Sequence, residues 1–385
     1  MRKYLINIKI LILPFLNILM FIILSSFGQT FMMKIGLSFI FSLVFMLIYV
    51  INFKKIPSKI NIAFILLMVY SLIKSLIAND LYYGFISIGT ISSLFLLTGL
   101  KMDKENWKKS FLITSIFSTI VLLLYNKKYV LINWNPNSIG SFCSLGMMMS
   151  ILALFLESNK RKKVIIFLLA IYQILQLYLT DCRTATFIFI IALVFSVYFN
   201  FFIKNKNSKV YFIFLIVCLS TTLLATQYVK LTNSNIFDWL VDLSKNLFKK
   251  STLFSDREYI WGICDYITKD FWIFGSGKSL YHMLYAHNMY YSIQYTYGFV
   301  GYILYSLFIF KTCNYIYKGN KSNDKCTFAA IIIFAAILLG QITENTMFTS
   351  NSNIFMAYIY LAIGLSLMKG VNQTDEKVNS IYTNI

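Results

Sequence analysis

The amino-acid sequence predicts an all-α polytopic membrane protein with about twelve transmembrane helices. Three observations predict this class. Of the 385 residues, 58% are hydrophobic and only 13% are charged, whereas soluble domains are about a quarter charged. Continuous apolar runs recur at the length that a membrane-spanning helix needs, about 20 residues. These runs are too long and too uniformly apolar for the alternating strands of an outer-membrane barrel.

The predicted spans follow the apolar runs along the whole chain. They cover residues 5–24, 31–51, 60–78, 82–100, 111–125, 138–156, 164–180, 185–203, 210–229, 288–310, 327–344 and 353–368. The first run continues too far to be a cleaved signal segment, so we interpret it as a permanent span. Residues 1–369 are expected to form one helical membrane domain, and 370–385 a polar cytoplasmic tail.

The positions of Lys and Arg set the predicted orientation, because cytoplasmic loops are enriched in both. With both termini inside, 22 of the 35 basic residues fall on the cytoplasmic side, in segments 1–4, 52–59, 101–110, 157–163, 204–209 and 311–326 and in the tail from Lys369. The net charge of +20 therefore indicates basic residues that face anionic lipid head groups. The sequence has no basic patch on a soluble domain, so it does not indicate nucleic-acid binding.

The longest predicted outer loop is 230–287, between spans nine and ten. Residues 235–250 place apolar and charged side chains on opposite sides of a helix, a pattern typical of a helix lying flat on a membrane. A second helix is predicted from Ser255, with Glu258 completing a capping box, to about Thr268. Its predicted buried stripe consists of Ile260, Ile263, Cys264 and Ile267.

The loop also contains Gly275-Ser276-Gly277-Lys278-Ser279, which resembles the end of a phosphate-binding loop. That motif requires a further glycine where this chain has Trp272. We therefore interpret the segment as a flexible turn.

Arg183 and Arg257 are the candidate anion-binding residues. Arg183 lies in a very short outer loop, where basic residues are disfavoured unless they have an anionic partner. That partner is either the neighbouring Asp181 or a phosphate held by the guanidinium fork. Arg257 lies in the first turn of its predicted helix, where a cation opposes the helix dipole. It is either an exposed, solvated residue or part of an anion site.

His287 is the candidate general base, since a neutral imidazole accepts a proton near neutral pH. The alternative is a structural histidine. Glu344, near the outer end of span eleven, is a candidate to balance an arginine or to act as a second acid or base. The cysteines are expected to be free thiols, with a Cys182–Cys264 bridge as the alternative, and no spacing indicates a metal site.

An ordered set of motifs resembles the O-antigen ligase/polymerase superfamily. It begins with Asp-Cys-Arg-Thr-Ala entering a helix and continues with Arg-Glu-x-Ile-Trp and Phe-Gly-Ser-Gly. It ends with Ala-His-Asn-x-Tyr, followed by Gly298 and Gly301. The resemblance runs from Thr180 to span twelve. It departs from the more usual pattern at Cys182, where Ser commonly precedes the arginine, and it does not separate polymerases from ligases.

The resemblance implies an enzyme that transfers a glycan from polyprenyl diphosphate at the outer face of the cytoplasmic membrane. Arg183 and Arg257 would hold the diphosphate and His287 would activate the acceptor hydroxyl, with Asp181, Asn288, Tyr290 and Glu344 in supporting positions. The aromatic stretch Tyr285–Tyr297 would stack on sugar faces. No cofactor or metal is implied, because the leaving group is already activated.

The resulting prediction is an inverting polymerase of lipid-linked oligosaccharide repeat units. Its partners would be the lipid-linked substrate, membrane lipids, and a flippase and a chain-length regulator of the same pathway. One alternative is a ligase that moves the finished glycan to a lipid or wall acceptor. A less favoured alternative is a flippase or other transporter, which should show broken helices and charges at mid-membrane. The in-span charges Lys9, Lys34 and Lys74 instead lie toward helix ends.

Overall fold

A computed structural model provides the fold of the protein. It describes residues 10, 11, 13, 14, 18, 58–79, 104–126, 136–180, 182, 185, 186, 188–194, 235–248, 257–277, 288–320 and 338. Within these residues every regular element is a helix and none is a strand, which confirms the all-α class. The predicted spans 31–51, 82–100, 210–229 and 353–368 and the tail 370–385 lie outside the described residues.

The described helices follow the apolar runs closely. In chain order they are α3 (Ser58–Ile77), α5 (Lys104–Asn126), α6 (Pro136–Leu156), α7 (Lys160–Tyr178), α11 (Asn235–Phe248), α12 (Arg257–Thr268), the short 3-10 helix η3 (Lys269–Phe271) and α13 (Met289–Asn320). Helices α3, α6 and α7 match the predicted spans 60–78, 138–156 and 164–180.

Two of the described helices extend beyond their predicted spans. α5 starts at Lys104 rather than 111, because Trp107 and Phe111 are buried and their rings stack with centroids 5.4 Å apart. α13 continues to Asn320 rather than 310, and its backbone leaves helical geometry at Gly298, with φ 64° and ψ −162°. The predicted continuous span 288–310 is therefore two helical segments joined at a sharp break.

Two of the described helices are long and apolar enough to cross a membrane, Glu105–Asn126 and Tyr290–Lys311. Because the second contains the break, its straight part starts at Phe299.

A polar clamp joins α5, α6 and α7 inside their bundle. The buried Gln173 of α7 donates from Nε2 to Ser115 Oγ (2.7 Å) and Thr119 Oγ1 (2.8 Å) of α5. Its Oε1 accepts from Ser150 Oγ of α6 at 2.8 Å. Side-chain hydrogen bonds of this kind hold helices together where apolar surroundings supply no hydrophobic driving force.

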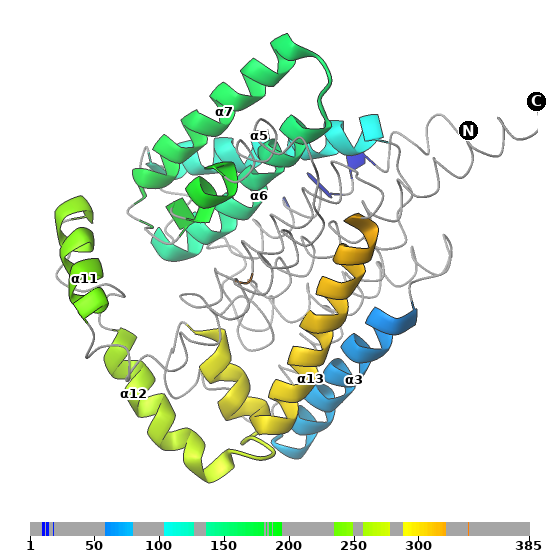
Figure 1. Ribbon diagram of the computed structural model, residues 1–385, viewed down its shortest axis with the longest axis vertical. Coiled ribbons are helices and arrows are strands. Elements are labelled where there is room, and N and C mark those ends of the chain that lie inside the picture. Colours follow the sequence, from blue (N-terminus) through cyan, green and yellow to red (C-terminus); the bar gives the residue numbers. More distant parts are fainter. Residues whose placement is uncertain are drawn as a thin grey trace, which may run out of the picture.

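Polar contacts also join the helices at both ends of this bundle. Lys108 and Glu157, from two predicted cytoplasmic segments, form an ion pair at 3.1 Å. At the other end Asn126 Nδ2 donates to the Gln176 carbonyl at 3.0 Å. Figure 1 shows α11 and α12 along the left side of the molecule, below the bundle of α5, α6 and α7.

α11 has the predicted helical structure, and its polar side is exposed. Its bounds, Asn235–Phe248, lie within the predicted 235–250. Asp238, Asp242 and Lys245 are exposed, as expected for the charged side of an amphipathic helix.

Protonation of Glu157 is expected to weaken the bundle at acidic pH. Hydrogen bonds from the Asn159 N–H and from Lys108 hold the pKa of this buried carboxyl below its ordinary value. A lowered folded-state pKa contributes stability that is present above the unfolded value, about 4.3, and is lost as the pH falls through the folded value. Glu157→Gln should lower the free energy of unfolding by about 1.5 to 3 kcal/mol at neutral pH. It should also remove the fall in unfolding temperature that we expect for the purified wild-type protein as Glu157 becomes protonated at acidic pH. An unchanged fall in the variant would contradict the assignment.

Candidate active site

The described residues contain part of the predicted site. Arg257, Asn288 and Tyr290 lie within them, and their surroundings are set by α12 and by the first segment of α13, which we call the entry helix (residues 289–297). His287, Arg183, Asp181 and Glu344 lie outside the described residues.

α12 and the entry helix pack side by side and run in the same direction. Near their starts the rings of Trp261 and Tyr291 stack with centroids 6.1 Å apart. Further along, Phe271 of η3 meets Tyr295 edge to face at 6.0 Å. Because both contacts advance together along the chain, the two helices start at the same end, as Figure 1 also shows.

The buried stripe of α12 is centred on Trp261, a residue that the sequence prediction omitted. Trp261 and Cys264 are fully buried against Tyr291 and Tyr295, and Ile260 and Ile267 are partly buried beside them. The helix ends at Thr268 as predicted. The indole is the largest apolar group on this face, so its burial makes the main contact that aligns the two helix starts.

Arg257 is buried, with only 8% of its surface exposed. This excludes the interpretation of Arg257 as an exposed, solvated residue. A guanidinium is rarely buried unless it is paired, and Arg257 does have interactions within the protein. The buried cation stands at the first described residue of α12, where the helix dipole adds to its positive potential.

Asn288 caps the entry helix through its side-chain oxygen, and its side-chain NH₂ group takes no part in the cap. Its Oδ1 accepts from the N–H groups of Tyr290 (2.9 Å) and Tyr291 (3.4 Å), which are orphan donors of the first turn. The side chain is fully buried. In the described part of the chain its Nδ2 has no hydrogen-bond partner. A buried donor without a partner costs about 1 to 3 kcal/mol, so this amide is suited to an acceptor atom on a ligand.

Together these features place positive potential at one end of two parallel helices. Arg257 and Asn288 each lie about one turn before the stacked pair Trp261 and Tyr291. Two aligned helix starts, a buried guanidinium and a buried amide donor all favour an anion. His287 directly precedes Asn288 in the sequence.

The break at Gly298 positions the entry helix. Residues Trp272–Gly277, which follow η3, bond to the backbone on both sides of the break. The bonds run from Ser276 N to Tyr295 O (2.8 Å), Gly277 N to Thr296 O (2.9 Å), Phe299 N to Trp272 O (2.7 Å) and Val300 N to Ile273 O (3.1 Å). The backbone groups that leave the helical ladder at the break are thereby paired, as an apolar environment demands.

The Gly-Ser-Gly segment is a turn, as predicted, but it is anchored rather than loose. Gly275 and Gly277 are buried, both with φ 72°, a conformation that favours glycine. Lys74 of α3 donates from Nζ to the Gly275 carbonyl at 3.0 Å. The hydroxyl of Tyr70 of α3 lies within hydrogen-bond distance of the carbonyls of Phe274 (3.0 Å) and Tyr297 (3.1 Å), which share its single proton. Three separate parts of the chain therefore meet at the break.

Sequence reasoning did not assign these roles to Tyr70 and Lys74. A lysine inside an apolar span was the available signal, because an intramembrane charge requires a partner. Its partner, a backbone carbonyl 201 positions away, has no counterpart in the local sequence pattern.

The predicted stacking of sugars on the tyrosines of the entry helix was wrong for the described residues. Tyr290, Tyr291, Tyr295 and Tyr297 are all buried. Tyr290 contacts the rings of Tyr302 and Tyr305, so it is part of the core. These rings are occupied in helix packing and present no face to a ligand.

In the loop that contains Arg183, the structure describes the nearby residues Thr180 and Cys182. Thr180 donates to the Leu177 carbonyl (2.6 Å) and accepts from the Cys182 N–H (3.2 Å), which makes a tight turn after α7. Cys182 is buried against Gly140 of α6, where an added Cβ would lie 2.7 Å from its Sγ. The described cysteines Cys143, Cys182 and Cys264 are free thiols, so the alternative Cys182–Cys264 bridge is absent.

Within the described residues no cluster of three His, Cys, Asp or Glu side chains could hold a metal ion. No protein-family model matches this chain, and no curated protein sequence matches it. The fold and the site define the class of molecule: a helical protein with two helices of membrane-spanning character and a buried, positively polarised pair of helix starts.

Proposed function

We propose that the protein is a membrane glycosyltransferase that polymerises polyprenyl-diphosphate-linked oligosaccharide repeat units during surface polysaccharide assembly. The reaction would take place at the outer face of the cytoplasmic membrane. The proposal rests on the ordered motifs that resemble the O-antigen ligase/polymerase superfamily. The single structural observation that supports it most is the burial of both Arg257 and the capping Asn288 at the starts of α12 and the entry helix, two helices that pack together through Trp261 and Tyr291.

This arrangement suits a diphosphate leaving group. In the proposed reaction the acceptor hydroxyl oxygen attacks the anomeric carbon, and the bond from that carbon to the phosphate oxygen breaks. His287 takes the hydroxyl proton, and the polyprenyl diphosphate leaves with the electron pair. Arg257, together with Arg183, would stabilise the charge that develops on the diphosphate. The amide of Asn288 would donate a hydrogen bond to a phosphate or sugar oxygen.

The broken helix α13 bears on the transporter alternative, since transporters bind substrate at such breaks. Here the backbone groups at Gly298 bond to Trp272–Gly277 and are not left for a ligand. The available donor, Asn288 Nδ2, lies at the start of the entry helix and not at the break. The observations therefore favour chemistry at the helix starts over binding at the break.

Reconstitution tests the proposed reaction directly. Purified protein in lipid nanodiscs, given a polyprenyl-diphosphate oligosaccharide, should produce a ladder of longer glycans without nucleotide sugar. Mass spectrometry and gel electrophoresis would measure the ladder. Transfer of the glycan only to a separately added lipid acceptor would indicate the ligase alternative. If the substrate is not consumed either with or without the added acceptor, both activities are contradicted.

A further inference from the structure

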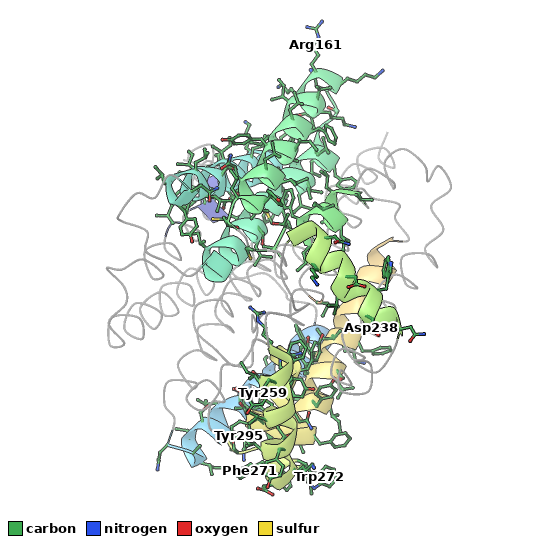
Figure 2. All side chains as sticks on the ribbon, turned by 90° about the vertical axis from the view of Figure 1, so that its left-hand side faces the viewer. Arg161, Asp238, Tyr259, Phe271, Trp272 and Tyr295 are labelled. Atoms are coloured by element: carbon green, nitrogen blue, oxygen red, sulfur yellow. The ribbon has the colours of Figure 1, made fainter. Side chains whose placement is uncertain are left out.

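The turn that closes the break carries four consecutive apolar residues with exposed side chains, Phe271 to Phe274, which we call the aromatic tip. Trp272 is 57% exposed and Phe274 is 62% exposed. Figure 2 shows Phe271 and Trp272 at the lower end of the molecule. A contiguous exposed apolar patch of this kind marks an interaction surface.

The backbone carbonyls of the aromatic tip are bonded from within the protein. Each of its four carbonyls accepts a hydrogen bond, from Gly275 N to Phe271 O (2.8 Å), Phe299 N to Trp272 O (2.7 Å), Val300 N to Ile273 O (3.1 Å) and the Tyr70 hydroxyl to Phe274 O (3.0 Å). A loop exposed to water has no need of such pairing, because water bonds its carbonyls. Irregular backbone in contact with lipid does need it.

The aromatic tip also continues the apolar outer surface of the helices that it joins. The ring of Trp272 lies 6.4 Å from that of Phe299, the first residue after the break. Phe299 begins a stripe of exposed apolar side chains along α13, namely Phe299, Ile303, Leu307 and Phe310. α3, which packs against α13, has a similar exposed stripe, namely Ile62, Ile65, Leu66, Val69, Ile73, Leu76 and Ile77. Exposed apolar stripes of this kind on neighbouring helices are suited to contact with lipid.

We propose that the aromatic tip is immersed in the outer-leaflet interface of the lipid bilayer and anchors the junction of α12 and α13 there. Trp and Tyr gather at this depth of a membrane because their rings are apolar and their edges polar. Lys269 and Asp270, both exposed, directly precede the tip and suit the head-group layer. Lipid is favoured over a protein or glycan partner, because the tip meets the exposed apolar stripe of α13 through the Trp272–Phe299 contact.

The anchor would set the depth of the candidate site independently of what the site does. The carbonyls of Trp272 and Ile273 hold the backbone just after Gly298, and the entry helix runs from Asn288 to that break. Fixing the tip at the interface therefore fixes the level at which Arg257 and Asn288 stand.

Spin labelling tests the proposed immersion. A nitroxide would be attached at position 274 or, as the matched control, at position 259 in a variant whose six native cysteines are replaced. Tyr259 is 76% exposed on the face of α12 away from the packed stripe. In phosphatidylcholine–phosphatidylglycerol nanodiscs, the label at 274 should collide more often with oxygen than with a water-soluble nickel complex, and the label at 259 should show the reverse. Preferential collision of the label at 274 with the nickel complex, or protection from both reagents, would overturn the proposal.

Substitutions in the native chain give a second readout, should the cysteine-free variant not fold. Phe274→Asp should lower the unfolding temperature in nanodiscs, because it places a carboxylate in the apolar interface. Tyr259→Asp, on the exposed face of α12 and outside the tip, should leave that temperature unchanged. Equal shifts for the two variants would overturn the proposal, whether or not the protein proves to be a glycosyltransferase.

Discussion

Gly298→Ala is expected to lower the free energy of unfolding by on the order of 3 kcal/mol, since it combines backbone strain with overpacking. Gly298 has φ 64° and ψ −162°, a conformation almost confined to glycine. A Cβ at this position would overlap the carbonyl group of Ile273 and the backbone nitrogen of Gly275. Both clashes are with backbone atoms, which cannot move aside as a flexible side chain can. The measurements are thermal and denaturant unfolding of the purified protein.

Gly262→Ala is the matched control for this substitution. Gly262 lies inside α12, is exposed, and has no atom within 4 Å of an added Cβ. Alanine should therefore stabilise the helix by about 0.5 to 1 kcal/mol. If Gly298→Ala unfolds at the same denaturant concentration as the wild type, the break is not a requirement of the fold.

His287→Ala is expected to lower the rate of glycan transfer by about 10²- to 10⁴-fold, the usual contribution of a general base. Arg257→Ala and Arg183→Ala should each lower it by about 10²- to 10³-fold, because each would remove a group that we propose stabilises the leaving diphosphate. The reconstituted polymerisation assay measures all three rates. In the His287 variant the amount of protein in the membrane should fall much less than the rate of glycan transfer does.

Lys269→Ala controls for the loss of a cation from the same loop. Lys269 follows α12 directly and is exposed, whereas Arg257 is buried at the other end of that helix. Its removal should leave the rate within about twofold of the wild type, since exposed charges are well screened by solvent. Equal losses for Lys269→Ala and Arg257→Ala would indicate a general effect of net charge and would remove the case for an anion site at Arg257.

The sequence predicted most of the described helices because their apolar runs are long and their ends are polar. α6 and α7 lie within two to four residues of their predicted limits at each end, a normal uncertainty for helix ends. α5 was predicted too short because its first turns contain charged residues. Lys108 is buried there by its ion pairs with Glu105 and Glu157, a compensation that hydropathy alone does not reveal.

For the candidate site, sequence reasoning selected Arg257 and Asn288 but could not establish their burial. Arginine side chains are mostly exposed, so the sequence favours exposure. Arg257 is buried only in the folded protein, where α12 packs on the entry helix. The tyrosines of the entry helix show the opposite error. Their number suggested a ligand-binding surface, whereas their contacts are with other helices.

The amino-acid sequence by itself determined the all-helical class, the apolar segments and the end of α12 at Thr268, because these depend on hydropathy and periodicity within short windows. The tertiary structure alone decided where α13 breaks, how the Gly275–Gly277 turn is anchored and which helix starts lie together. Each of these depends on hydrogen bonds between distant residues, as from Lys74 to Gly275 or from Tyr70 to Tyr297. A local pattern shows that a backbone group needs a partner in an apolar environment, but only the assembled fold shows which group that partner is.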